Sequence, residues 1–407
     1  MPLPESLRPF RSRSFRIYWA GQAISLIGTW MQQMAQGWVV TRLTSNAWIV
    51  GAVAVAGTLP MALLGLVGGQ LADKRSRRNI LIATQTALMI LAFGLGALAY
   101  ARALGLWHLF VLSGLLGVAA AFDLPAAQAF APDLVPPEDI PRAIALVQSI
   151  FHGSRLIGPA IAGLLIARFG EGSAFIANGL SFLAVIGSLL VIPRDDPKTR
   201  AGGARRGASA GAGLGYVRTD PVTRVLLPLI VLCMLFAFPF LVVLMAYYAR
   251  YVIHSGASGM GSIMSASGFG SLVGSVGLVI LGARAWRARI AAGVIWIGGA
   301  LTGLGLAQEL RSAMLFTMAL SFGISMMLGT SMQVVQRRVP NEIRGRVMAL
   351  FGIAMTSVMP LSGFALSATA DTVGLQRLML GCAVAFTVSA GALAMRIPAA
   401  VAPAPSR

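Results

Sequence analysis

Twelve long apolar stretches, separated by short polar loops, limit what this chain can fold into. About 20 helical residues cross a hydrocarbon core of about 30 Å. Stretches of that length lie near residues 17–40, 48–71, 79–100, 107–131, 142–167, 174–192, 225–248, 259–282, 290–308, 312–336, 346–370 and 374–396. Only 11% of the residues are charged, against about 25% in soluble domains. The sequence therefore predicts an all-α membrane protein with twelve transmembrane helices.

The predicted spans fall into two groups of six with related sequences. VPPEDIPRAIAL at 135–146 and VPNEIRGRVMAL at 339–350 agree in register, and about half of the chain separates them. Two six-helix halves of the same topology indicate parallel repeats around a central cavity. Residues 193–224 are charged and rich in Gly and Ala, a composition that predicts a cytoplasmic linker. The expected domains are an N-terminal half at 1–192 and a C-terminal half at 225–407.

Arginine and lysine gather on one side of the predicted membrane. The net charge is +19, and most basic residues lie in the N-terminal segment, the loops after even-numbered spans, the linker and the C-terminal tail. The positive-inside rule then places both termini in the cytoplasm. The charge is thus a topology signal, and no nucleic-acid partner is expected. The two cysteines lie in apolar segments and predict no disulfide framework.

The loop between the second and third spans carries the most specific motif, GQLADKRSRR, which begins at Gly69. Gly69 would permit a close helix approach, and the Asp73 carboxylate would suit the N-terminus of a neighbouring helix. Arg77, followed by Arg78, could reach Asp133 at the end of the fourth span. The plainer interpretation is a basic turn that serves only the positive-inside rule. The spacing of these residues favours a gating network.

The motif resembles the GxLaDrxGrr signature of the major facilitator superfamily, with Ser76 in the usual glycine position. FRIYWAGQAISLIGTWMQQMAQGWVVTRLT, FDLPAAQAF and VPNEIRGRVMALF are similar to segments of its exporter branch, which contains enterobactin exporters and macrolide efflux proteins. The likeness covers essentially the whole chain. It implies twelve helices in two pseudo-symmetric halves. It also implies that the cytoplasmic network latches the halves together in an outward-facing state.

The fifth span contains SRLIGPAIAG, which is similar to the GxxxGPxxGG pattern of antiporters in this superfamily. The residues that carry the likeness are Ser154, Gly158, Pro159 and Gly163. Small residues at this spacing let helices pack closely, and a proline bends the helix. Ordinary small-residue packing is the alternative interpretation. The resemblance implies an exporter that works by antiport.

Asp123 is the only acidic residue placed deep inside a predicted span. It lies about 15 Å from Asp133 along the helix, and His152 and Arg155 on the next span have a similar depth. A charge at mid-membrane costs about 2.5–3.5 kcal/mol, so such groups usually serve a function. In one interpretation Asp123 binds and releases protons, with Arg155 as its charge partner and His152 as a relay. In the other, Asp123 and Arg155 form a permanent structural ion pair.

Amide and aromatic side chains predict a cavity for large amphipathic molecules. The candidate cavity residues are Gln22, Trp30, Gln32, Gln33, Gln36, Gln128 and Gln148. Each glutamine, taken singly, could instead hydrogen-bond neighbouring helices. The second half has no acidic residue opposite Asp123, so a strongly cationic substrate would find few partners.

Together these features predict a secondary transporter that exports small amphipathic molecules, drugs or siderophores in type, by proton antiport. Its expected location is a bacterial cytoplasmic (inner) membrane, where it would act as a monomer among membrane lipids. Its partners would be a small-molecule substrate and protons. The sequence lacks clustered catalytic or metal-binding residues and a nucleotide-binding loop, so no enzyme activity, metal or cofactor is expected. A lysophospholipid flippase, a metal exporter and, in another class, a membrane channel are the alternatives.

Overall fold

The computed structural model describes residues 5–193, 210–282 and 285–397. Within these ranges the chain is helical almost throughout and contains no β-strand, which confirms the all-α prediction. Contacts divide the chain into two compact units. Unit 1 comprises Met1–Ser45, Ala52–Ala204 and Ser255–Ser265, and unit 2 comprises Asn46–Gly51, Arg205–His254 and Ala266–Arg407. The domain boundaries given above remain predictions, and residues 194–209 of the expected linker lie outside the described residues.

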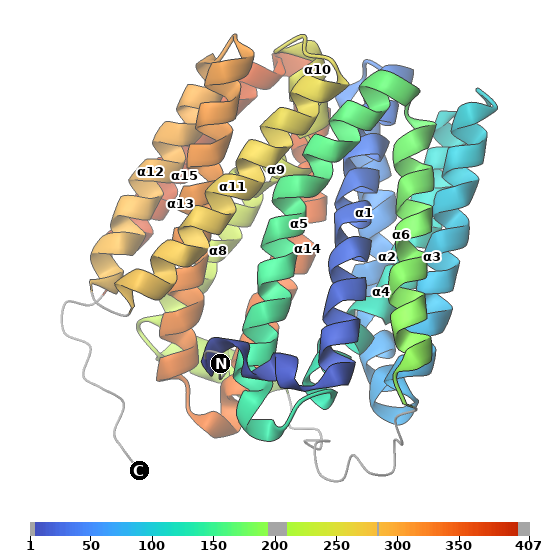
Figure 1. Cartoon of the computed structure of the whole chain (residues 1–407). Helices are drawn as coiled ribbons and strands as arrows, with labels where there is room; N and C mark the ends of the chain where they lie inside the picture. The colour runs from blue at the N-terminus through green and yellow to red at the C-terminus, as the bar shows by residue number, and fades with distance from the viewer. Residues whose placement is uncertain (1–4, 194–209, 283–284, 398–407) are drawn as a thin grey trace. The chain divides into compact units, whose positions relative to one another are not determined.

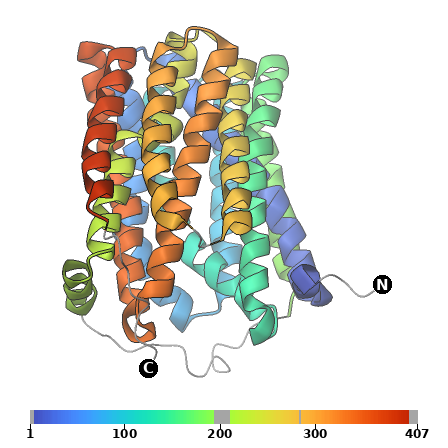
Figure 2. The same ribbon diagram turned by 90° about the vertical axis from the view of Figure 1, so that its left-hand side faces the viewer.

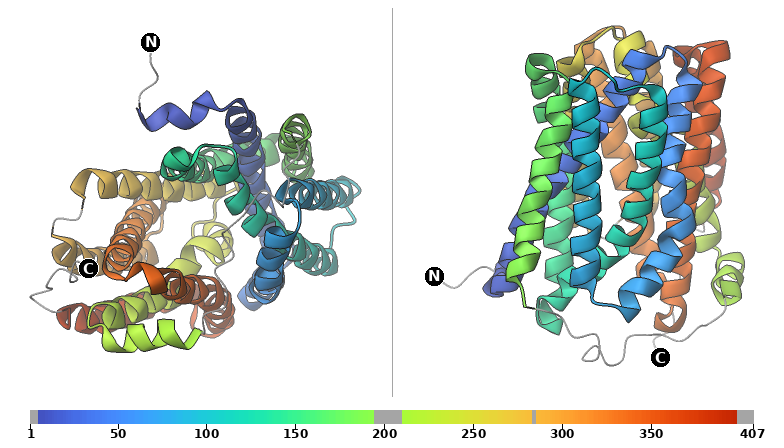
Figure 3. Two further views of the ribbon diagram at one scale, coloured as in Figure 1. Left: turned by 90° about the horizontal axis from the view of Figure 1, so that it is seen from below. Right: turned by 90° about the vertical axis from the view of Figure 1, so that its right-hand side faces the viewer.

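Long antiparallel helices build unit 1. Its elements are η1 (Glu5–Arg11), α1 (Arg13–Leu43), α2 (Ala47–Lys74, from Ala52 onward), α3 (Arg77–Tyr100), α4 (Leu106–Asp133), η2 (Pro137–Asp139), α5 (Ile140–Phe169) and α6 (Gly172–Val191). α1 packs against α5 and α6, and α3 packs against α4 and α6. Figure 3 shows α6, α3, α4 and α2 side by side. The short helix η1 lies across the end of unit 1 where α1 begins (Figure 1). We call this end, with η1 and the α2–α3 and α4–α5 loops, the basic end.

Unit 2 contains several shorter helices beside its long ones. Its elements are α7 (Ala210–Thr219), α8 (Thr223–Phe236), α9 (Phe238–Val242), α10 (Met245–Tyr251), α11 (Ala257–Leu281, from Ala266 onward), α12 (Trp286–Leu306), α13 (Leu310–Arg338), α14 (Asn341–Val373) and α15 (Leu375–Met395). α12 packs against α13 and α15, and α8 packs against α14 and α15. Figure 2 shows this group from the side.

Ten helices in the described ranges are long and apolar enough to cross a membrane, or eleven if α7 and α8, bent by 104°, form one span. α1 is not among them, although its 31 residues are long enough. Two arginines near its start and its glutamines make α1 less apolar than the other helices. With α1 included, the elements are consistent with the twelve transmembrane helices predicted from the sequence.

The seventh expected span, 225–248, is interrupted. α8 ends at Phe236, the short α9 follows, and α10 begins at Met245. Pro239 lies in the first turn of α9. Proline disfavours the helical conformation of the residue before it and has no N–H for the helical hydrogen bond. The expectation of one continuous helix here is therefore corrected, and Pro239 lies at the first of the two interruptions.

Aromatic and aliphatic side chains from α1, α3, α4 and α6 form a core towards the basic end of unit 1. Its buried members include Tyr18, Leu81, Ala126, Phe130 and Leu189. The rings of Tyr18 and Phe130 meet edge to face, with centroids 5.1 Å apart. Between helices in a membrane, such contacts stabilise through van der Waals packing, because lipid chains are as apolar as the side chains themselves. This core fixes the rotation of α4 and thereby the side of the helix on which its carboxylate lies.

The bend between α7 and α8 is held by Asp220. Its carboxylate accepts hydrogen bonds from the Thr223 backbone N–H and hydroxyl, each at 2.7 Å. Arg338 Nε on α13 donates a third bond, also at 2.7 Å. Burial by itself raises the pKa of Asp220, but the bonds from Thr223 and Arg338 outweigh burial and hold that pKa below its usual value.

Asp220→Asn is expected to reduce the free energy of unfolding by about 1–2 kcal/mol at neutral pH, because a charge-assisted bond becomes a neutral one. A carboxylate with a depressed folded-state pKa stabilises the fold above its unfolded pKa of about 3.9, and this contribution disappears as the pH falls through the folded value. The difference in Tm between variant and parent in detergent should therefore shrink as the pH is lowered below about 5. Arg218→Gln, at an exposed position nearby, is the control and should not change Tm. An equal Tm loss at all pH values would contradict this account.

Candidate functional site

Arg77 joins the start of α3 to the end of α4 at the basic end. Ser76 caps α3 by accepting a hydrogen bond from the Asn79 backbone N–H at 3.3 Å. From the first turn of α3, Arg77 Nη1 donates to Asp133 Oδ1 at 2.9 Å and to Oδ2 at 2.8 Å. The same nitrogen donates to the Ala129 carbonyl at 3.0 Å. The contact between Arg77 and Asp133 that the motif suggested is therefore present, and its gating role remains a proposal.

The neighbouring charges of the motif have different surroundings. The Asp73 side chain is 70% exposed, and its carboxylate lies 3.7 Å from Arg77 Nη2. Arg78 is buried and donates from Nε to the Leu189 carbonyl at 2.6 Å and from Nη2 to the Leu190 carbonyl at 3.3 Å. Arg78 thus joins the start of α3 to the end of α6, a role that the sequence did not indicate.

The close helix approach expected at Gly69 occurs one residue earlier. A Cβ added at Gly69 would meet nothing within 4 Å, whereas a Cβ at Gly68 would collide with the Ala121 carbonyl oxygen on α4. Successive residues point about 100° apart around a helix. The rotation of α2, which the motif does not specify, decides which glycine faces α4.

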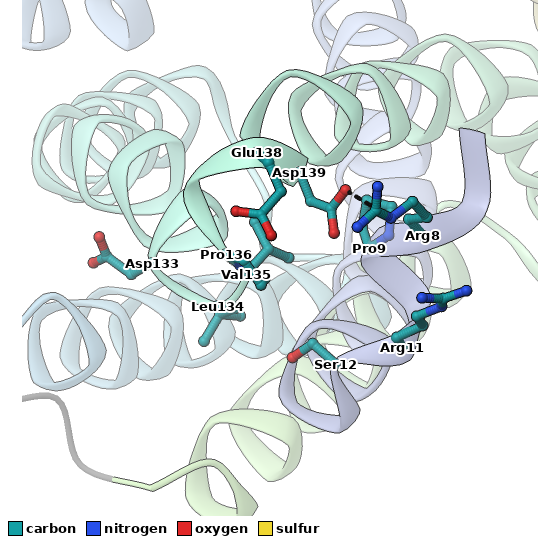
Figure 4. A pocket seen from close by; sticks show the side chains of 10 residues that line it. All are labelled: Arg8, Pro9, Arg11, Ser12, Asp133, Leu134, Val135, Pro136, Glu138 and Asp139. Carbon is teal, nitrogen blue, oxygen red and sulfur yellow. Dashed lines mark ion pairs between the residues drawn. The ribbon is translucent and has the colours of Figure 1, made fainter. Parts of the chain in front are cut away.

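A pocket of about 510 Å³ opens at the basic end between η1 and the α4–α5 loop (Figure 4). Its lining residues are Arg8, Pro9, Arg11, Ser12, Asp133, Leu134, Val135, Pro136, Glu138 and Asp139. Arg8 Nε lies 3.6 Å from Asp139 Oδ1, and Arg142 Nη1 lies 3.1 Å from the same oxygen. Asp139 is buried and anchors η1 to the start of α5. This anchor was not predicted from the sequence, although the acids of VPPED and the arginines of the N-terminal segment were its visible signal.

Asp123 receives its hydrogen bonds from α3. Thr84 Oγ1 donates to Asp123 Oδ1 at 2.6 Å, and Gln85 Nε2 donates to the same oxygen at 2.9 Å. Asp123 itself is half-buried. The expected ion pair between Asp123 and Arg155 is not formed, because the carboxylate faces α3. An equal count of residues along two helices does not by itself place two side chains on facing sides.

Arg155 on α5 packs against the indole ring of Trp30 on α1. Its guanidinium lies 5.5 Å from the centre of the Trp30 ring, within the range of a cation–π interaction. Trp30 also meets Phe151 with ring centroids 5.5 Å apart, and Phe151 meets His152 at 5.7 Å. The structure therefore brings Arg155 and His152 together with Trp30 and not with Asp123. We call Trp30, Phe151, His152 and Arg155 the aromatic cluster.

The candidate glutamines separate into buried and exposed groups. Gln32 is buried and accepts a hydrogen bond from Asn178 Nδ2 on α6 at 2.7 Å, so it bonds helices together. Gln36 is partly buried and donates to Ser113 Oγ at 3.5 Å. Gln33, Gln128 and Gln148 are exposed, and Gln22 is partly exposed.

Gly158 of the fifth-span motif lets α5 approach α1 closely, whereas Gly163 faces Ala257 and Ser258 at the start of α11. Ser154, Gly158, Pro159 and Gly163 are all buried. A Cβ added at Gly158 would lie 2.7 Å from Trp30 Cβ and 2.8 Å from the Ile27 carbonyl oxygen. Those distances are too short for any side chain.

Gly158→Leu is expected to separate α1 from α5, because overpacking at a tight contact typically costs about 1–3 kcal/mol. The yield of monodisperse protein and its Tm should both fall. Gly153→Leu, on the same helix, is the matched control, since a Cβ there meets nothing within 4 Å. If both variants behaved alike, the glycine at 158 would not be required for packing.

The chain resembles known transporters over nearly its whole length. A family model described as "Transmembrane secretion effector", within the major facilitator superfamily, matches residues 5–405. The chain belongs to this family. It is 28% identical over 378 residues to Macrolide efflux protein A of Streptococcus pyogenes, covering 90% of this chain and 91% of that protein. It is 24% identical to Multidrug efflux pump Tap of Mycolicibacterium fortuitum, covering 89% of this chain and 88% of Tap. A further match is the Staphyloferrin A transporter of Staphylococcus aureus, 26% identical over 44% of this chain and 45% of that protein.

Solved structures share the fold. A bacterial homologue of the human lysosomal transporter Spinster superposes with a TM-score of 0.75 at 15% identity, over 96% of this chain and 98% of that chain. A bacterial homologue of the iron transporter ferroportin gives a TM-score of 0.70 at 18% identity, over 94% and 98%. The chain is therefore a multi-pass membrane transporter of the major facilitator fold with a small-molecule substrate, and not an enzyme.

Proposed function

We propose that this transporter exports small amphipathic molecules in exchange for protons by alternating access. The observation that carries the proposal is Asp123, a half-buried carboxylate inside α4. Its hydrogen-bond donors, Thr84 and Gln85, are both neutral. The carboxylate can therefore gain and lose a proton without leaving a buried cation unpaired. Ionisable groups inside membrane spans commonly serve as proton relays.

The substrate surface is proposed on α1, α4 and α5. Exposed polar positions within these helices are Thr29, Gln33, Gln128, Gln148 and Ser149. On α3 and α6, by contrast, exposed positions such as Ile90, Leu180 and Leu183 are apolar, as suits contact with lipid. Amide side chains beside the aromatic cluster suit molecules that combine apolar bodies with polar groups. The relatives named for macrolide and multidrug efflux support the same substrate type.

The charges of α5 complete the proposed coupling site. Arg155 and His152 lie on α5, the helix that follows α4 in the chain, and we include them in the coupling site because ionisable groups inside membrane spans commonly serve in proton transfer. The GQLADKRSRR motif and Asp133 form the proposed gate at the basic end. We place that end and both termini in the cytoplasm of a bacterium, with the transporter acting as a monomer in the inner membrane.

The test is transport into inverted membrane vesicles with an acidic interior. A macrolide or a carboxylate siderophore is expected to accumulate above its outside concentration and to leak out when a protonophore collapses the gradient. A lysophospholipid and a divalent metal ion are the comparison substrates. Substrate that equilibrates but never accumulates would indicate a channel. Accumulation of only the lysophospholipid or only the metal ion would overturn the proposed substrate class.

A further inference from the structure

Two buried polar side chains on α3 hold one oxygen of Asp123. Thr84 and Gln85 are adjacent and buried, and both donate to Oδ1, at 2.6 and 2.9 Å. The orientation of the Gln85 amide is itself set, because its Oε1 accepts from the buried Ser25 hydroxyl on α1 at 3.5 Å. The Gln85 NH₂ group is therefore directed at the carboxylate. Three helices contribute to this arrangement, in which Thr84 and Ser25 have roles that were not predicted from the sequence.

The second carboxylate oxygen has a different environment. Asp123 Oδ2 accepts no hydrogen bond from any residue in the described ranges, and it is not among the buried atoms that lack a partner, so it retains accessible surface. The carboxylate is thus asymmetric: Oδ1 is anchored by two donors and Oδ2 is open. Oδ2 is therefore the oxygen that remains available to take up a proton.

Thr84 can serve both charge states of the carboxyl group. Its hydroxyl carries one proton, and two acceptors lie within reach, Asp123 Oδ1 at 2.6 Å and the Leu81 carbonyl at 3.1 Å. When Asp123 is ionised, the hydroxyl donates to Oδ1. When Oδ2 takes a proton, Oδ1 becomes a weaker carbonyl acceptor, and the Thr84 proton can turn to Leu81. The Thr84 hydroxyl therefore keeps an acceptor in both charge states.

We propose that Thr84 and Gln85 are positioning residues for proton exchange, which anchor Oδ1 so that the proton is bound and released at Oδ2. The step is a simple protonation: an O–H bond of a hydronium ion breaks, its proton forms an O–H bond at Oδ2 and a water molecule is left, and the reverse exchange with water releases the proton. This inference rests on the proposed proton antiport. Among other titratable groups, the Tyr18 phenol on α1 interacts electrostatically with Asp123, while Arg155 and His152 on α5 belong to the aromatic cluster.

The test is the pH dependence of proton-driven efflux in proteoliposomes. Thr84→Val and Gln85→Leu each remove one donor to the ionised carboxylate and should shift the midpoint of the pH profile upward by about one pH unit. Thr84→Ser keeps the hydroxyl and should retain the parental midpoint. Thr86→Ala is the matched control, since the Thr86 hydroxyl donates to its own helix at Ile82, 2.7 Å away. A purely structural role would lower efflux at every pH without moving the midpoint.

The outcomes separate this inference from the function on which it rests. In one outcome, Asp123→Asn loses proton coupling, but neither Thr84→Val nor Gln85→Leu shifts the midpoint of the pH profile. That result would overturn the positioning role of Thr84 and Gln85 and leave proton antiport standing. Full coupling in the Asp123→Asn variant would overturn both. If one variant does not fold, the other still decides, because each removes a separate donor to the same oxygen.

Discussion

Vesicles that contain the Asp123→Asn variant are expected to equilibrate substrate without accumulating it. The amide has nearly the shape of the carboxylate but cannot exchange a proton, so substrate movement is no longer tied to the pH gradient. Alternation between the two access states does not need the charge, and exchange of labelled for unlabelled substrate should therefore persist. The measurement is the ratio of inside to outside substrate in inverted vesicles with an acidic interior.

Asp123→Glu is the matched comparison. It keeps an ionisable carboxyl group but moves it by one methylene relative to Thr84 and Gln85, so we expect slower efflux that still depends on the gradient. Glu171→Gln controls for the loss of an acid in general, since Glu171 pairs with Arg42 at 2.6 Å at the opposite end of unit 1. Gradient-driven accumulation at the parental level by Asp123→Asn would show that the proton site lies elsewhere.

The surroundings of Asp123 show which part of the site the sequence could predict. The depth of Asp123 inside its span could be predicted by counting residues from Asp133 at the end of the span, because a helix rises by a constant distance per residue. Depth alone also suggested Arg155 as a partner, and here the prediction failed. Whether two side chains on neighbouring helices meet depends on the rotation of each helix. That rotation is set by packing such as the Tyr18–Phe130 contact, which no local pattern reveals.

The same limit explains the glycines of α2 and the interruption near Pro239. A motif fixes the order of residues along a helix, but Gly68 rather than Gly69 meets α4 because of how α2 is turned. Pro239 was visible in the sequence, yet an apolar stretch of the right length outweighed it in the prediction of a single span. The length and apolarity of a segment indicate that it crosses the membrane. Whether it does so as one unbroken helix depends on individual backbone N–H groups, which proline lacks.

Arg77→Ala is expected to reduce efflux about tenfold or more, which corresponds to roughly 1.4 kcal/mol. Nη1 of Arg77 contacts both oxygens of Asp133 and the Ala129 carbonyl, and its Nε donates to the Ala72 carbonyl at 3.3 Å. The arginine side chain is only 15% exposed, so its removal leaves the partly buried Asp133 carboxylate without this cation. Arg77→Lys should restore efflux only in part, because the single ammonium nitrogen of lysine cannot bond Asp133 and the Ala72 carbonyl through two separate nitrogens.

A double-mutant cycle separates the contribution of this ion pair from a general effect of lost charge. If Arg77 and Asp133 act through each other, Arg77→Ala combined with Asp133→Ala should be no more defective than Arg77→Ala alone. Arg75→Ala, which removes an exposed arginine from the same loop, should leave both efflux and Tm close to the parental values. Additive losses in the double variant would mean that the two residues act independently. The proposed gate would then have to rest on Asp73, whose contact with Arg77 is long and largely exposed to solvent.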